Sequence, residues 1–92
     1  MPRIQIELPS ALRILADGQA SIPLQADRVG AALERLGQAH PHVLSRILTR
    51  GGQLRPHVNL FVNESDIRHC QGLDTELNDG DRLMVVPSVA GG

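Results

Sequence analysis

The sequence predicts a small α+β domain in which one main helix crosses one face of a mixed sheet of four to five strands. Apolar and polar residues alternate in three separate runs, and a period of two is typical of strands with one buried face. One longer segment carries its apolar residues at helical spacing. A last run, residues 83–86, is apolar without interruption, as in a strand at the centre of a sheet.

The composition limits the size of the fold and the partners it can bind. Ninety-two residues make one domain, and since Phe61 is the only aromatic residue, Leu, Ile and Val must form the core. Nine basic residues stand against ten acidic ones without a like-charge run, so binding to nucleic acid or to a membrane surface is not expected. No apolar run has the roughly 18 to 20 residues of a membrane span.

The cellular location also follows from the sequence. The N-terminal residues alternate in polarity, whereas a signal peptide has a continuous apolar stretch. The single cysteine, Cys70, has no partner for an internal disulfide. A cytoplasmic protein is therefore expected.

The first two strands are predicted near the N-terminus. The buried face of the first consists of Ile4, Ile6 and Leu8. Pro9 ends this strand, and the turn signal Asp17-Gly18 precedes a second alternating run. The apolar residues of that run are Ala20, Ile22 and Leu24. Pro23 has no N–H to donate, which places the second strand at an edge of the sheet.

The main helix follows the second strand. Asp27 is the expected N-cap, and the apolar stripe consists of Val29, Ala32, Leu33 and Leu36. Gly37 and Pro41 are expected to end the helix. Residues 43–48 then predict a further short helical turn before a loop at Gly51-Gly52.

The C-terminal half completes the sheet. The third alternating run contains Val58, Leu60 and Val62, and residues 67–70 are expected to return beside it. The apolar run 83–86 is predicted to be central and covered on both faces. The order strand, strand, helix and three strands is the β-grasp (ubiquitin-like) arrangement. Residues 1–87 form this domain, and residues 88–92 are predicted to be a flexible tail.

The C-terminal Gly91-Gly92 pair is the feature most closely tied to chemistry. Glycine is common in this chain, so the internal pair Gly51-Gly52 is the one expected by chance. The terminal pair instead follows a strand and a run of small residues. A tail of little bulk can enter a narrow active site because glycine has no Cβ atom. The residues predicted to enter the active sites of partner proteins are Val89, Ala90, Gly91 and Gly92.

Several motifs resemble those of the ThiS/MoaD sulfur-carrier family. They are Val62-Asn63-Glu64, the stretches 73–81 (LDTELNDGD) and 83–87 (LMVVP), and the terminal Gly91-Gly92. The resemblance also covers the first strand and the helix, and hence nearly the whole chain. The ending VPSVAGG and the long segment between the helix and the third strand are most similar to the CysO type of this family.

This resemblance implies a carrier that catalyses nothing itself. An E1-like adenylating enzyme would use ATP to activate the Gly92 carboxylate, which a sulfur donor then converts to a thiocarboxylate. An acceptor enzyme, such as a pyridoxal-phosphate-dependent cysteine synthase, would take the sulfur for cysteine or for a sulfur-containing siderophore or cofactor. A metalloprotease that trims the C-terminus is a further implied partner. No stably bound cofactor is implied.

Two other functions stay open. One is a ubiquitin-like modifier joined through Gly92 to a target lysine, and the other is a β-grasp docking module without chemistry. The four histidines lack convincing ligand spacing, so no metal site is expected. Cys70 is interpreted as a small residue at a strand end rather than as a catalytic nucleophile.

A docking face for partners is also predicted. Phe61 is out of phase with the buried residues of its strand, so it should lie on the open face of the sheet. Met84 and Val86 are expected to join it there. Aromatic residues contribute strongly to interfaces, which favours this face as the partner surface. The alternative is a parity shifted by one residue, with Phe61 in the core.

Overall fold

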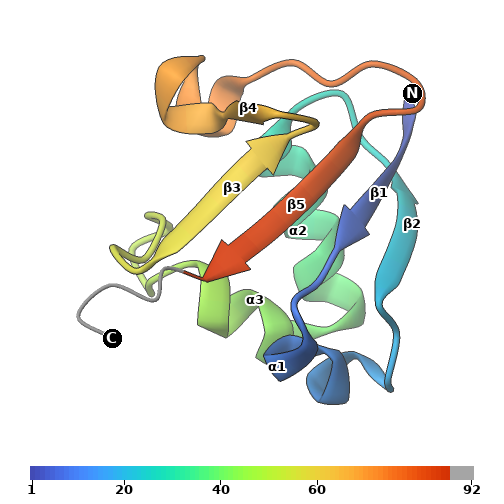
Figure 1. Ribbon diagram of the computed structural model, residues 1–92, viewed down its shortest axis with the longest axis vertical. Coiled ribbons are helices and arrows are strands. Elements are labelled where there is room, and N and C mark those ends of the chain that lie inside the picture. The colour runs from blue at the N-terminus through green and yellow to red at the C-terminus, as the bar shows by residue number, and fades with distance from the viewer. Residues whose placement is uncertain (88–92) are drawn as a thin grey trace.

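The computed structural model describes residues 1–87, which fold into a five-stranded mixed sheet with helices on one face (Figure 1). The strands are β1 (Arg3–Glu7), β2 (Ser21–Gln25), β3 (Val58–Val62), β4 (Ser65–Asp66) and β5 (Arg82–Pro87). Their spatial order is β2-β1-β5-β3-β4, with β1 and β5 parallel and all other neighbours antiparallel. This is the predicted β-grasp arrangement. The predicted tail, with Val89, Ala90, Gly91 and Gly92, lies outside the described residues.

The N-terminal strands form where their alternation predicts, but Ala20 was wrongly placed on the buried face, because it lies exposed in the bend before β2, where Ile22 is buried and Leu24 half-buried. Ile4, Ile6 and Leu8 are buried, and β2 lies at the sheet edge with Pro23 opposite Gln5. Between the two strands are the short helix α1 (Ser10–Arg13) and the 3-10 helix η1 (Ile14–Ala16), which the sequence did not predict. Elements this short carry no measurable apolar period. The chain then turns at Asp17, whose φ of 57° lies in the left-handed region.

Helix α2 (Val29–Ala39) buries the predicted stripe against the sheet, but its first turn is capped differently from the prediction. Arg28 occupies the N-cap position, and its side chain makes no capping hydrogen bond. The Val29 N–H instead donates to the Thr75 carbonyl oxygen at 3.0 Å. The predicted cap Asp27 is wrong because a distant backbone segment satisfies this donor.

The end of α2 also differs from the prediction, because Gly37 lies inside the helix rather than after it. Helix α3 (Pro41–Ile47) begins two residues after α2 and carries the predicted second helical turn. A Cβ atom at Gly37 would overlap the end of the Leu44 side chain. Gly37 is therefore a packing contact between the two helices.

Replacing Gly37 by alanine is expected to destabilise the domain. Alanine in a helix interior normally stabilises by roughly 0.5–1 kcal/mol relative to glycine. Here the added methyl group must displace Leu44, and overpacking of this kind costs about 1–3 kcal/mol. Urea unfolding of Gly37→Ala should show a net loss. When Leu44 is also replaced by alanine, Gly37→Ala should increase the stability of the domain. An increase in stability when Leu44 is present would contradict the packing role.

The C-terminal strands confirm the predicted centre of the sheet and correct two details. The segment returning beside β3 is Ser65–Asp66, while Ile67–His69 forms the 3-10 helix η2. Strand β5 is central, between β1 and β3, as expected. It is not covered on both faces, because the helices lie on one side only. Leu83 and Val85 are buried there, whereas Met84 and Val86 on the other side are half-buried.

Candidate functional site

The open face of the sheet carries an apolar group formed by Phe61, Met84 and Val86, called here the apolar patch. Phe61 lies directly opposite Met84 in the β3–β5 ladder, and Val86 lies two residues further along β5. All three side chains are half-buried, whereas their neighbours Leu60 and Val85 are in the core. The predicted parity is confirmed, and the alternative with Phe61 in the core is wrong.

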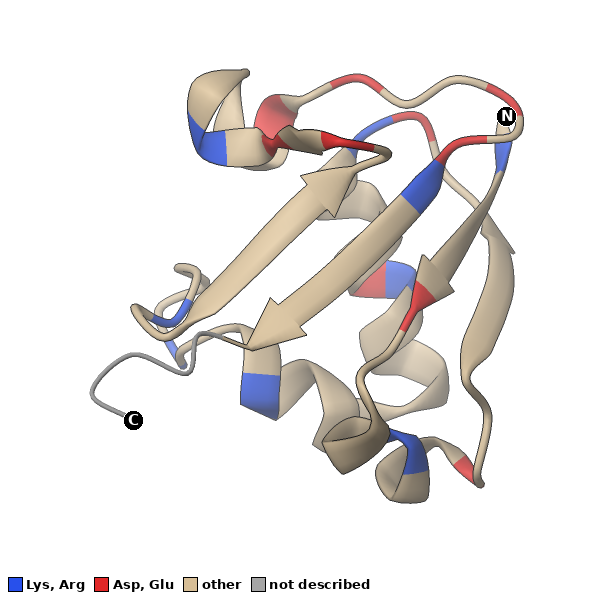
Figure 2. Cartoon of the chain, in the orientation of Figure 1, with Lys and Arg blue, Asp and Glu red and all other residues tan. Residues whose placement is uncertain are grey.

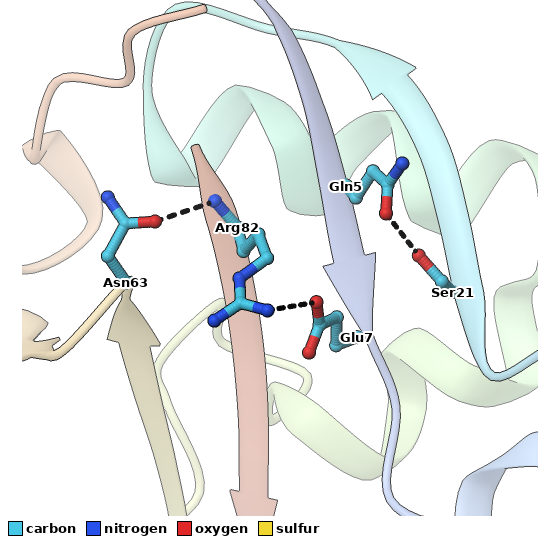
Figure 3. A network of polar contacts seen from close by, with 5 residues as sticks. All are labelled: Gln5, Glu7, Ser21, Asn63 and Arg82. Atoms are coloured by element: carbon cyan, nitrogen blue, oxygen red, sulfur yellow. Dashed lines mark hydrogen bonds and ion pairs between the residues drawn. The ribbon is translucent and has the colours of Figure 1, made fainter. Parts of the chain in front are cut away.

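Polar side chains occupy the neighbouring part of this face, on β1, β2 and the start of β5 (Figure 3). Arg82 forms an ion pair with Glu7 at 3.4 Å, and the Ser21 hydroxyl donates to Gln5 Oε1 at 2.8 Å. The Arg82 backbone N–H donates to Asn63 Oδ1 at 3.1 Å. Since the ion pair is largely exposed, it contributes little stability. Its effect is to give the apolar patch a polar border on one side.

Acidic residues are concentrated at one end of the molecule, where Figure 2 shows most of the red segments together with several blue ones. Six of the ten acidic residues lie between residues 64 and 81, in the turns around β4 and before β5. Residues 35–63 contain four arginines, three histidines and no acidic residue. They include α3 and the loop that leads to β3, at the end of the sheet where β5 finishes. The described domain thus has an acidic end and a basic end.

The basic end contains a cavity of about 350 Å³ lined by Ser45, Arg46, Arg55 and His57. Arg55 is held in place because its Nε donates to the Ser45 carbonyl oxygen at 2.9 Å. His57 directly precedes Val58, which pairs with Pro87, the last residue of β5. The cavity therefore lies beside the point where the chain leaves the sheet. These residues were not predicted as functional, although the long acid-free stretch was a signal in the sequence.

Cys70 and the possible metal ligands are the other side chains that the sequence singled out. Cys70 is exposed, and its Sγ contacts the Asp66 carbonyl oxygen at 3.5 Å. The segment before it is a 3-10 helix, so its expected place at a strand end is wrong. Within residues 1–87, no three His, Cys, Asp or Glu side chains are grouped to hold a metal ion. None of the described helices is long and apolar enough to cross a membrane.

Comparison with known proteins decides the family. A model described as the ThiS family matches residues 6–92, from within β1 to the last residue of the chain. The chain belongs to the ThiS family. The resemblance drawn from the motifs is thereby confirmed, and the match includes Gly91 and Gly92.

Relatives of this ThiS family member include both carriers and modifiers. The sulfur carrier protein CysO of Mycobacterium tuberculosis is 33% identical over 91 residues, which cover 97% of this chain and 98% of that protein. A chain in the crystal structure of the Amycolatopsis orientalis BexX/CysO complex has a TM-score of 0.88 and 30% identity, covering 97% of this chain and 99% of its own. The small archaeal modifier protein 1 of Methanosarcina acetivorans also has a TM-score of 0.88, with 31% identity, covering 100% and 98%.

Proposed function

We propose that this chain is a sulfur carrier whose Gly92 carboxylate is converted to a thiocarboxylate. The observation that carries the proposal is the family match, which extends to Gly92, together with relatives named as sulfur carriers over nearly their full length. The reactive carboxylate is that of Gly92, either as the natural end or after trimming by a protease.

The chemistry takes place in two steps on a partner enzyme. A Gly92 carboxylate oxygen attacks the α-phosphorus of ATP and releases pyrophosphate, which leaves an acyl-adenylate with an electrophilic carbonyl carbon. A sulfide donor (HS⁻) then attacks this carbon, the C–S bond forms, AMP leaves with the C–O bonding electrons, and the thiol proton is lost to solvent. The product sulfur is ionised at neutral pH by the same logic that makes a thiolate nucleophilic. It can therefore be donated to an acceptor enzyme.

The apolar patch is the surface that we assign to partner docking. Phe61 and Met84 lie side by side on the open face, where the helices do not cover them. A half-buried aromatic residue beside apolar neighbours has the composition of an interface centre, and the Glu7–Arg82 pair supplies a polar border. The similarity to a chain of the BexX/CysO complex is consistent with a carrier that associates with another protein.

A second function is favoured by the relatives named as small archaeal modifier proteins. In this alternative, a lysine amine of a target protein attacks the Gly92 carbonyl of the acyl-adenylate, the isopeptide bond forms, and AMP and a proton leave. The protein has no lysine, so it could not form polymers in which one copy is joined to a lysine side chain of another. Stable conjugates of higher mass in cells would identify this function.

The test of the carrier function is the intact mass of the chain after incubation with an E1-like adenylating enzyme from the same organism, ATP and sulfide. The expected result is a mass gain equal to the exchange of one oxygen for one sulfur, located at Gly92 by fragmentation. Omitting ATP should abolish the gain. If the enzyme binds the chain and forms the acyl-adenylate but no thiocarboxylate appears with any sulfur donor, the modifier function is favoured.

A further inference from the structure

The basic end of the domain is a second recognition surface, distinct from the apolar patch. We infer that the surface formed by Arg46, Arg50, Arg55 and His57 docks on an acidic rim around the opening through which partner enzymes receive the tail. This inference rests on the proposed function, because it concerns the proteins that receive Gly92. It adds a recognition element that lies outside both the tail and the apolar patch.

The geometry of these residues supports binding to another molecule. Arg46 and Arg50 are exposed, and neither has a hydrogen-bond or ion-pair partner among residues 1–87. Arg55 is oriented by its bond to the Ser45 carbonyl oxygen, which keeps its guanidinium at the cavity wall. No acidic residue occurs between residues 35 and 63 to neutralise this surface locally. The positive charge is therefore available to a partner.

The position of this surface identifies which part of a partner it meets. His57 adjoins the Val58–Pro87 pair, so part of the basic surface lies near the end of β5, from which the chain continues toward Gly92. Five residues separate Pro87 from the end of the chain, and they span at most about 18 Å when extended. When the tail reaches into an active site, the basic surface stays outside at the rim. It would then meet protein side chains at the opening rather than the phosphates of ATP beside Gly92.

The opposite end of the domain strengthens this assignment. Residues 64–81 contain six acidic residues and one arginine, so this stretch has a net negative charge, and Figure 2 shows its red segments gathered at one end with a few blue ones. An acidic rim would attract the basic end and repel the acidic end. Such complementarity orients the approach and raises the association rate, and salt screens it. The carrier would therefore approach the partner enzyme with its basic end facing the opening.

The experiment compares the double variant Arg46→Glu/Arg50→Glu with a matched control, Arg3→Glu/Arg28→Glu. The control makes the same change in net charge, but at the other end, where the Arg3 backbone N–H donates to Asp79 and the Arg28 backbone forms a β-bridge with that of Glu76. Association with the adenylating enzyme is measured by stopped flow from low to high salt. At low salt the first variant should associate about tenfold or more slowly than the unmodified chain, and the control much less so. High salt should remove the difference.

Three readouts separate the outcomes. At saturating enzyme, the first variant should gain sulfur at Gly92 as fast as the unmodified chain, because the rim contact acts before chemistry. The rim contact is overturned if both double variants associate equally slowly, or if Arg46→Glu/Arg50→Glu associates as fast as the unmodified chain. This holds even if the unmodified chain gains sulfur normally. Binding without any sulfur gain in the unmodified chain overturns the carrier function instead, and no binding overturns both.

Inorganic phosphate distinguishes a protein rim from a small-anion site. At ionic strength matched with chloride, phosphate should weaken the association no more than chloride does. Stronger competition by phosphate, with shifts of the NMR signals of Arg55 and His57, would assign the cavity to phosphate groups and overturn the acidic-rim proposal.

Discussion

A chain that lacks Gly92 is expected to keep its fold and to gain no sulfur at all. The buried core of the described domain lies within residues 1–87, so the truncated chain keeps every residue of that core. The truncated chain ends in Gly91, whose carboxylate is one residue, up to about 3.6 Å, too short to occupy the position of the Gly92 carboxylate. A displacement of about 1 Å already reduces enzymatic rates by about a hundredfold. Intact mass and thermal unfolding together measure the two outcomes.

The internal glycine pair provides a matched control for this truncation. A Cβ atom at Gly51 would meet only the Thr49 hydroxyl oxygen, at an ordinary 3.8 Å. The Gly51→Ala variant should therefore fold and gain sulfur as the unmodified chain does. Gly91→Val, which keeps the terminal carboxylate but adds bulk beside it, should bind the enzyme and react far more slowly. Full sulfur gain by the truncated chain would contradict the assignment of Gly92 as the reactive residue.

Leu60→Ala is expected to destabilise the domain severely, while its neighbour Phe61→Ala acts mainly on binding. Leu60 is 0% exposed, and truncation of such a residue costs about 2–5 kcal/mol. Total stability of a domain is only about 5–15 kcal/mol, so this loss is a large part of it. Urea unfolding of Leu60→Ala should show a correspondingly lower midpoint.

The Phe61→Ala variant tests the opposite face of the same strand. Because Phe61 is only half-buried, its truncation should cost clearly less than the roughly 3–5 kcal/mol of a core aromatic residue. If the apolar patch docks partners, affinity for the adenylating enzyme should fall about tenfold or more. Calorimetric titration of the folded variant measures this. A loss of stability as large as that of Leu60→Ala, with unchanged affinity of the folded protein, would contradict the docking role.

The features that could be predicted from the sequence are those encoded by local periodicity. Alternation placed Ile4 and Ile6 in the core and Phe61 on the open face, and the stripe of α2 was correct at every position. Pro23 correctly marked the edge strand because its missing N–H excludes it from a central ladder. The family was readable from its motifs, including the terminal Gly91-Gly92. Each of these signals lies within a few residues of the structure that it specifies.

Contacts between distant segments decided the rest. In the first turn of α2, the Val29 N–H donates to the Thr75 carbonyl oxygen, so the nearby Asp27 was not a sufficient signal for the cap. Gly37 is in contact with Leu44 of α3, so it did not mark the end of the helix. The apolar run of β5 was expected to be covered on both faces of the sheet. In the structure the helices pack on one face only, and this depends on how the whole chain assembles. The basic end forms because the fold brings Arg46 of α3 to the same cavity as Arg55 and His57 of the loop before β3. A periodic pattern encodes which side of an element is buried, whereas its neighbours depend on how the whole chain packs.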